Sequence, residues 1–478
     1  MIVQTDSGAV RGDGHAFLAV PYAAPITSKT RFDAPQSFAW EGVRDATRLG
    51  AVCPQVPTYG PVGRNATSAL AAGEDFLTLN IRTPSVEGSA PVLVWVHGGG
   101  YAVGSANEPV LQSAAFAASG IVEVTVNYRL GAMGFLRVDG APDNRGLLDL
   151  IAALGWVRRN IAAFGGDPAR VTLAGRSAGG FAVAALLAMP AAHGLFARAM
   201  PQSGASTGIA TETDAEKLAA RMRSALGVDP REAALADLLV AQRDLCNESY
   251  ERHDFDRDGA AAMLGVPFVP ICGTDSLPLH PEDAAGQGRT APVPMMIGCT
   301  TAEYLTHSTA LPAALDFAAV AALLHERVRP LRLTGDDIVQ RYRAALPDHT
   351  PHGIWRAVAG DLVFQNPATR FARLHRRGQP VWKYLYGPDG ADETGAPHGA
   401  EVGAVWYRQG MDLALQPERQ RVTDTAFAVA VHDFWAAFIH GHSNWPCPQG
   451  SVLRLRSGYI AVERDPFDTR TALWTEAG

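Results

Sequence analysis

Three short, predominantly apolar runs with many β-branched side chains stand out along the chain. They extend from Pro91 to Val96, from Ile121 to Val126 and from Val171 to Ala174, and glycine or polar residues bound each of them. Runs of this length and composition are typical of strands that are buried on both faces of a parallel sheet. The pattern therefore predicts a mostly parallel central sheet.

A helical pattern lies between the second and third runs. In the stretch Gly146 to Phe164, apolar side chains recur at helical spacing, at Leu147, Ile151, Leu154, Val157 and Ile161. The stretch Phe181 to Leu187 is rich in alanine and leucine and predicts a second helix packed against the sheet. This order of strand, helix and strand indicates an α/β fold with helices on both faces of the sheet.

Two later stretches, Thr211 to Cys246 and Leu311 to Leu346, also have helical patterns. In open α/β sheets, such insertions tend to lie above the carboxyl ends of the strands, where ligands bind. We therefore expect helical cap insertions over a pocket, at approximately residues 205–260 and 305–375. Since no repeat or linker divides the chain, we expect residues 1–478 to form a single domain.

The composition excludes several classes of protein. Of the 478 residues, 47% are hydrophobic and 19% are charged, which is ordinary for a soluble globular protein and argues against disorder. The net charge is −7 and the 41 Lys and Arg residues are scattered, so no nucleic-acid partner is expected. No run approaches the roughly 18 apolar residues of a membrane span, and the first residues do not resemble a signal peptide. We expect a cytoplasmic protein that is a monomer or a weak homo-oligomer.

The cysteines do not form a recognisable framework. There are five, widely spaced and without a CxxC pair: Cys53, Cys246, Cys272, Cys299 and Cys447. An odd number with this spacing argues against both a disulfide framework and a zinc site. Reduced thiols and no metal are therefore expected.

The strongest local signal is the sequence Gly175-Arg176-Ser177-Ala178-Gly179, which follows the third predicted strand and precedes a predicted helix. A G-x-S-x-G motif needs this context, because the strand must turn sharply into the helix to present the serine hydroxyl at the edge of the sheet. The alternative is a plain glycine-rich turn. The context favours Ser177 as a catalytic nucleophile.

A second glycine-rich segment, His97-Gly98-Gly99-Gly100-Tyr101, follows the first predicted strand. Consecutive glycines leave backbone N–H groups unshielded, and in an ester hydrolase such donors stabilise the oxyanion of a tetrahedral intermediate. A plain turn or a phosphate-binding loop is the alternative, but no lysine follows at the spacing of a Walker A motif. The segment is thus a candidate oxyanion loop.

A nucleophilic serine needs a general base and an acid that orients the base. In enzymes with this strand-to-helix turn, the acid follows the serine along the chain and the histidine follows the acid. Glu303 comes shortly after a predicted strand, Met295 to Gly298, although a single glutamate is more commonly a solvated loop residue. His398 lies on a glycine-containing loop after another predicted strand, Val381 to Tyr386. Local sequence leaves other downstream histidines open, namely His375, His432, His440 and His442.

Ordered motifs along most of the chain resemble the type-B carboxylesterases, the group that includes bacterial para-nitrobenzyl esterases and cholinesterases. The resemblance extends from about Val20 to Glu401 and includes Val20-Pro21-Tyr22-Ala23, Glu74-Asp75, Asn127-Tyr128-Arg129-Leu130-Gly131, Phe164-Gly165-Gly166-Asp167-Pro168 and Gln202-Ser203-Gly204. It implies the α/β-hydrolase fold and a serine carboxylic-ester hydrolase that acts on small-molecule esters without a metal or an organic cofactor.

The resemblance also implies roles for individual residues. Gly298 to Glu303 is similar to the block that carries the triad acid, and His398-Gly399-Ala400-Glu401 to the block that carries the triad histidine. The implied residues are a triad of Ser177, Glu303 and His398 and an oxyanion hole made by the N–H groups of Gly99, Gly100 and Ala178. Acyl transfer or amide hydrolysis on the same triad stays open, as does a non-catalytic binding role.

The chain departs from the family pattern at several places, including Leu150, where the family usually has glutamine after Asp149. The family usually has glutamate immediately before the nucleophile, where this chain has Arg176. A cation that faces the histidine would disfavour its protonation, unless Arg176 turns away to pair with a carboxylate. The cysteine that follows Glu74-Asp75 in secreted members is Phe76 here, which leaves Cys53 without its implied partner.

Overall fold

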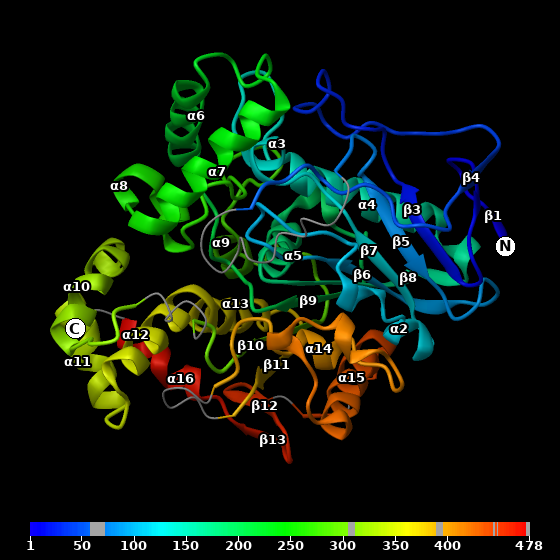
Figure 1. Ribbon diagram of the computed structural model, residues 1–478. Coiled ribbons are helices and arrows are strands. Elements are labelled where there is room, and N and C mark those ends of the chain that lie inside the picture. The colour runs from blue at the N-terminus through cyan, green and yellow to red at the C-terminus, as the bar shows by residue number, and fades with distance from the viewer. Residues whose placement is uncertain (58–71, 305–310, 389–394, 443–444, 447, 475–478) are drawn as a thin grey trace.

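A ten-stranded sheet forms the centre of the molecule in the computed structural model, which describes residues 1–57, 72–304, 311–388, 395–442, 445–446 and 448–474 (Figure 1). The strands of this sheet are β3 (Ala16–Pro21), β5 (Thr78–Arg82), β6 (Ala90–Val96), β7 (Val122–Val126), β8 (Gly166–Arg176), β9 (Arg198–Gln202), β10 (Met295–Thr300), β11 (Val381–Tyr386), β12 (Ser451–Arg456) and β13 (Tyr459–Arg464). A smaller sheet contains β1 (Ile2–Gln4), β2 (Ala9–Arg11) and β4 (Val43–Asp45).

The large sheet is parallel in its centre and antiparallel at both edges. Its strand order is β13-β12-β11-β10-β9-β8-β6-β7-β5-β3. All neighbours from β12 to β7 are parallel, whereas β13, β5 and β3 pair in the antiparallel direction. The prediction of a mostly parallel α/β sheet is therefore confirmed.

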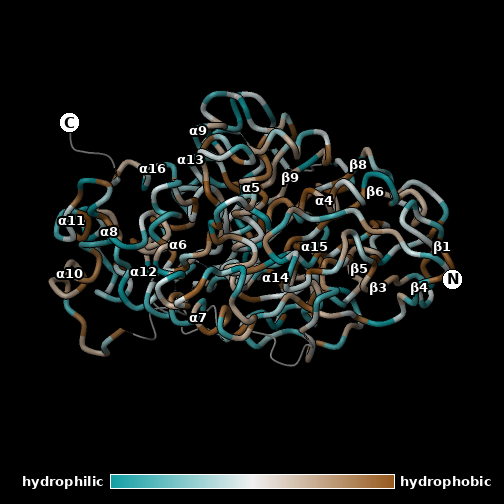
Figure 2. The backbone as a smooth tube through the Cα atoms, turned by 90° about the horizontal axis from the view of Figure 1, so that it is seen from above, coloured by the Kyte–Doolittle hydropathy of each residue, from teal (hydrophilic) through white to brown (hydrophobic). Residues whose placement is uncertain are grey.

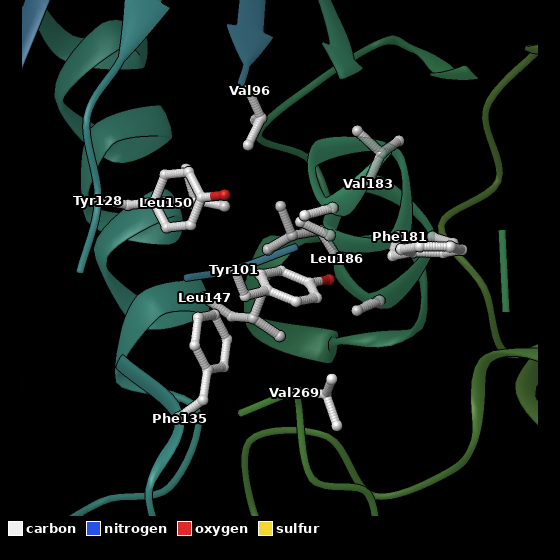
Figure 3. Close-up of a cluster of buried hydrophobic side chains, with 14 of the residues drawn as sticks. Val96, Tyr101, Tyr128, Phe135, Leu147, Leu150, Phe181, Val183, Leu186 and Val269 are labelled. Atoms are coloured by element: carbon white, nitrogen blue, oxygen red, sulfur yellow. The ribbon is translucent and has the colours of Figure 1, made fainter. Parts of the chain in front are cut away.

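Helices cover both faces of the sheet, and each face has its own buried core. Alternate side chains of β6 separate the two cores, because Val92, Val94 and Val96 face one core and Leu93 and Trp95 face the other. The first core includes helices α4 (Arg145–Asn160), α5 (Ala178–Ala188) and α13 (Asn366–His375), and Figure 3 shows side chains of α4 and α5 meeting there. The second core includes α2 (Ala115–Ala118), α14 (Val402–Val405) and α15 (Thr425–His440).

The remaining helices surround these cores, and several of them extend the molecule at one end. They are α3 (Gly131–Phe135), α6 (Glu212–Leu226), α7 (Leu235–Arg252), α8 (Phe255–Asp258), α9 (Pro281–Gly286), α10 (Phe317–Val328), α11 (Gly335–Ala345), α12 (Pro351–Gly360) and α16 (Pro466–Arg470). Both views place α8, α10 and α11 at the end of the molecule that is opposite to β1 (Figures 1 and 2). The helices α6 to α8 and α10 to α12 fall within the two ranges expected to form a cap, and their role as a cap stays a prediction.

The expected elements are present, but several begin or end at other residues. Helix α4 ends at Asn160, and a 3-10 helix, Ile161–Phe164, continues the stretch up to Gly165, which has a φ of 76°. Strand β8 begins at Gly166, ahead of the apolar run, because Gly166 pairs with Ala90 before the register shifts. Helix α5 begins at Ala178, directly after the serine rather than at Phe181.

A buried ion pair joins the loop after β7 to helix α4. Arg129 and Asp149 are fully buried, and the guanidinium donates from Nη2 to Asp149 Oδ1 at 2.6 Å and from Nε to Oδ2 at 2.8 Å. In the same loop, the Tyr128 hydroxyl donates to the backbone carbonyl of His97 at 3.2 Å. The ion pair therefore also anchors the loop that contacts the glycine-rich segment after β6.

We expect Asp149→Ala to lower the free energy of unfolding by about 3–5 kcal/mol, because removing one partner of a buried pair leaves the other charge uncompensated. Denaturant unfolding followed by circular dichroism measures this loss. Asp244→Ala is the matched control, since its pair with Arg243 has exposed fractions of 60% and 41%, and surface pairs contribute about 0–1 kcal/mol. Similar losses in the two variants would contradict the structural role given to Asp149.

Candidate active site

Ser177 stands in the turn between β8 and α5 with a strained backbone. Its φ is 60° and its ψ is −123°, a combination that side chains rarely adopt. The N–H of Ser177 donates to the carbonyl of Gln202 in β9 at 2.9 Å. No side chain fits at the two glycines of this turn. A Cβ atom added to Gly175 would lie 2.6 Å from the backbone of Gly179, and one added to Gly179 would lie 2.1 Å from the carbonyl oxygen of Val96. The turn therefore has the geometry that a nucleophile elbow requires.

The glycine-rich loop after β6 packs directly on this serine. A Cβ at Gly98 would lie 3.1 Å from the Cβ of Ser177, and a Cβ at Gly99 would lie 1.9 Å from the carbonyl oxygen of Val103. Gly99 and Gly100 have φ values of 119° and 60°. The loop thus places backbone rather than side chains next to the nucleophile, as an oxyanion hole of N–H groups needs.

Glu303 and His398, which are far apart in the sequence, meet in a hydrogen bond of 2.5 Å between Glu303 Oε2 and His398 Nδ1. Glu303 is buried, and its Oε1 accepts from the Ser203 hydroxyl at 2.7 Å and from the backbone N–H of Thr300 at 2.8 Å. These three contacts fix the carboxylate. An imidazole that donates from Nδ1 to a carboxylate keeps Nε2 available as a base.

Aromatic side chains form one wall beside the histidine. The ring of Phe364 lies 4.7 Å from the ring of His398 and 6.0 Å from the rings of Phe181 and Tyr304. Phe364 belongs to a π-helical segment, Asp361–Gln365, between α12 and α13. Such segments are frequent at functional sites because they redirect a side chain within a helix. The imidazole therefore has an apolar neighbour on the side of these rings.

Arg176 and Glu401 place opposite charges beside the serine and the histidine. Arg176 is only 6% exposed, and a Cβ at Gly399, the residue after His398, would lie 3.2 Å from its Nη1. Burial and the negative charge of Glu303 raise the pKa of the Glu401 carboxyl and the charge of Arg176 lowers it, with a net pKa of about 7. No described residue forms an ion pair with Arg176. Arg176 therefore lies next to the histidine loop and interacts with Glu401 at longer range.

The other histidines considered from the sequence lie elsewhere. His375, His432 and His440 contact the backbone carbonyls of Val293, Val405 and Ser119, at 2.8, 2.7 and 3.0 Å. His442 is exposed. Among the candidate histidines, His398 is the one that contacts the candidate acid.

Sequence reasoning missed two residues of the site. Ser203 lies in a family motif, but its bond to Glu303 depends on β9 lying beside β10, which the local sequence does not show. Phe364 lies in a helical stretch more than thirty residues before His398, and no spacing rule connects the two. Their contribution becomes visible only in the folded chain.

Known proteins are similar to this chain along most of its length. A model of the carboxylesterase family matches residues 1–452. The chain belongs to the carboxylesterase family. It is 32% identical over 490 aligned residues to the para-nitrobenzyl esterase of Bacillus subtilis (strain 168), and the match covers 97% of this chain and 96% of that protein.

Solved structures of carboxylesterases have the same fold. One structure of a para-nitrobenzyl esterase superposes with a TM-score of 0.84 at 31% identity and covers 100% of both chains. A carboxylesterase of Geobacillus stearothermophilus superposes with a TM-score of 0.82 at 29% identity and covers 99% of this chain and 100% of its own. The protein is thus a serine carboxylic-ester hydrolase with the α/β-hydrolase fold, and its substrates are small esters. In the described part of the chain, no helix combines the length and the apolar character needed to cross a bilayer.

We expect Arg176→Glu to move the acid limb of the kcat/KM profile to higher pH. The variant replaces a cation beside the histidine loop with a carboxylate, which stabilises the protonated imidazole that is inactive as a base. The carboxylate of Glu303 already contacts His398, so the added charge acts in the same direction as that of Glu303. Cationic esters should also improve relative to anionic ones.

Rate profiles between pH 4 and 9 for the wild type, Arg176→Glu and Arg176→Gln measure this effect. The glutamine variant removes the charge without reversing it, and its acid limb should fall between the other two. An unmoved acid limb together with an unchanged charge preference would identify Arg176 as a structural residue.

Proposed function

We propose that Ser177, His398 and Glu303 are the catalytic triad of this carboxylesterase and that the N–H groups of Gly99, Gly100 and Ala178 form its oxyanion hole. The observation that carries the proposal is the hydrogen bond between Glu303 and His398. The three triad residues follow strands β8, β10 and β11, which are parallel members of one sheet. Their carboxyl ends lie along one edge, where α/β enzymes bind their ligands.

The first half of the proposed reaction forms an acyl-enzyme. Ser177 Oγ attacks the ester carbonyl carbon while His398 Nε2 takes the hydroxyl proton, and the carbonyl oxygen becomes an oxyanion that accepts from the backbone N–H groups. When the bond to the alcohol oxygen breaks, the protonated His398 gives its proton to the leaving alcohol. Glu303 stays ionised throughout, holds the imidazole in one tautomer and stabilises its positive charge.

The second half releases the acid. His398 takes a proton from a water molecule that attacks the acyl carbon, and a second tetrahedral intermediate forms in the same oxyanion hole. The bond to Ser177 Oγ then breaks, and His398 returns the proton to the serine. The proposed cycle needs neither a metal nor an organic cofactor.

The surroundings of the site are part of the proposal. Residues 1–478 form one catalytic domain with cap insertions at approximately 205–260 and 305–375, to which α6 to α8 and α10 to α12 contribute the helices. The protein works in the cytoplasm as a monomer or a weak homo-oligomer, without a nucleic-acid partner. The free thiol of Cys53 supports a reducing compartment, because Phe76 replaces the cysteine with which it would pair in secreted members.

We expect Ser177→Ala to lose roughly 10⁴-fold to 10⁶-fold in kcat for ester hydrolysis, and to lose labelling by an organophosphate. His398→Ala should lose a similar factor, because triad members act as a unit. Hydrolysis of a para-nitrophenyl ester measures both variants, with His440→Ala as the matched control on α15. If His440→Ala is inactive while His398→Ala retains activity, the assignment of the base is wrong.

We expect five free thiols in the denatured protein, because the cysteine count is odd and Phe76 removes the partner that Cys53 would need. Cys447 lies outside the described residues and is expected to be reduced as well. In the native protein Cys53 should react slowly, since burial raises the pKa of its thiol to about 12. Titration with a thiol reagent after anaerobic purification measures both states. The denatured Cys53→Ser variant should have four free thiols. Three or fewer free thiols in the denatured wild type would contradict a cytoplasmic location.

A further inference from the structure

A pocket of about 410 Å³ lies between helices α7, α10 and α12. Tyr250, Tyr304 and Trp355 supply aromatic rings to its lining, Leu264 supplies an aliphatic side chain, and Arg327 supplies a buried cation. Two further lining residues, Glu251 and Glu326, are exposed, and Glu326 pairs with Arg329 at 3.0 Å. The inner lining is thus aromatic and cationic, and its acidic residues face solvent.

Arg327 lacks the partner that a buried cation normally has. The side chain is 7% exposed, and its guanidinium carbon lies 5.8 Å from the ring of Tyr304 and 5.7 Å from the ring of Trp355. Its Nη2 donates to His253 Nε2 at 2.5 Å, while His253 Nδ1 contacts the carbonyl of Ala262 at 2.7 Å. Its Nη1 is buried without a hydrogen-bond partner, and no described carboxylate forms an ion pair with it.

His253 does not compensate the charge of Arg327. Burial and the positive charge of Arg327 together lower the pKa of this histidine to about 3. The imidazole is therefore neutral and serves as a hydrogen-bond acceptor. Burying a guanidinium without a carboxylate is unfavourable, and proteins normally pair such a charge. The arrangement fits a site whose anion comes from a ligand.

A series of aromatic rings connects the pocket with the proposed catalytic centre. Tyr304 directly follows Glu303, and its ring lies 6.0 Å from the ring of Phe364, which lies 4.7 Å from the ring of His398. Leu264 contacts the segment that follows Ser203, because a Cβ at Gly208 would lie 2.2 Å from Leu264 Cδ1. A substrate that extends from Ser177 past these side chains would lead toward Arg327.

We propose that this pocket binds a free carboxylate carried by the ester substrate, at a distance from the bond that is hydrolysed, and that Arg327 is the residue that recognises it. The carboxylate accepts from the guanidinium, and the rings of Tyr304 and Trp355 hold the guanidinium in place. This inference rests on the proposed function of Ser177. The preferred substrates are half-esters of long dicarboxylic acids rather than neutral esters of the same length.

The test compares para-nitrophenyl half-esters of dicarboxylic acids of increasing length with para-nitrophenyl alkanoates of matching length. For each chain length, kcat/KM for the half-ester is divided by kcat/KM for the neutral ester. A general loss of activity affects both values equally and leaves this ratio unchanged. In the wild type this ratio should rise to a maximum at one long chain length. In Arg327→Met the maximum should fall by about 10- to 100-fold, as expected for a lost hydrogen bond to a charged group.

Arg176→Gln is the matched control, because it removes a second cation that lies next to the histidine loop. In Arg176→Gln, the ratio of half-ester to neutral ester should decrease to a similar extent at all chain lengths. In Arg327→Met, the ratio should decrease mainly for the long substrates. A wild type that shows no preference for the acid at any length would overturn the proposal. An Arg327→Met variant with the wild-type maximum would overturn it as well.

Direct binding separates this inference from the assignment of the triad. Octanedioate or decanedioate should bind to the Ser177→Ala protein in a calorimeter and raise its melting temperature, and Arg327→Met in the same background should lose both effects. These readouts do not depend on turnover, so they hold even if another serine is the nucleophile. A cooperative melting curve for Arg327→Met shows that the variant is folded, and equal binding to both proteins would reject the site.

Discussion

The close approach of backbone segments around Ser177 is the constraint on which the site depends. Side chains are excluded on every side of the turn, because a Cβ at several glycines would lie within 3 Å of backbone atoms; these are Gly98, Gly99, Gly175, Gly179, Gly180 and Gly204. At the turn itself, β6, β8 and α5 therefore approach one another through backbone atoms. The serine and the candidate oxyanion loop are held in register by this contact, and a single added methyl group would push them apart.

Strand β9 connects this turn to the acid and the base. The carbonyl of Gln202 accepts from the N–H of Ser177, and its side-chain oxygen accepts from the indole of Trp435 in α15 at 2.8 Å. The next residue, Ser203, donates to Glu303. Two adjacent residues at the end of one strand thus contact the nucleophile turn and the carboxylate that orients His398. The strained backbone of Ser177 persists because a buried sheet with a core on each face surrounds it.

The sequence predicts the centre of this fold better than its edges. Strands β6 and β8 are buried on both faces and appear as apolar runs, whereas β12 and β13 alternate with charged residues and gave no comparable signal. The nucleophile could be predicted because strand, turn and helix are consecutive in the chain. The pairing of Glu303 with His398 could not be predicted from local sequence, since it depends on β10 and β11 being neighbours, and only the family resemblance indicated it. The relation of Arg176 to Glu401 had no sequence signal, because a periodic pattern reports burial and not the identity of a neighbour.

The charges of the site differ from the charge of the whole molecule. The chain has a net charge of −7, which repels an anionic ester at long range, but salt screens such repulsion beyond about 8 Å. Arg176 and Arg327 are buried cations for which no described carboxylate forms an ion pair. Charges act more strongly in a poorly solvated pocket than on the surface, so for a ligand that has entered, these two cations outweigh the acidic groups of the surface. The proposed preference for anionic esters therefore depends on two positions, one beside the histidine loop and one among the helices α7, α10 and α12, and both are buried, so each can be changed without altering the surface of the protein.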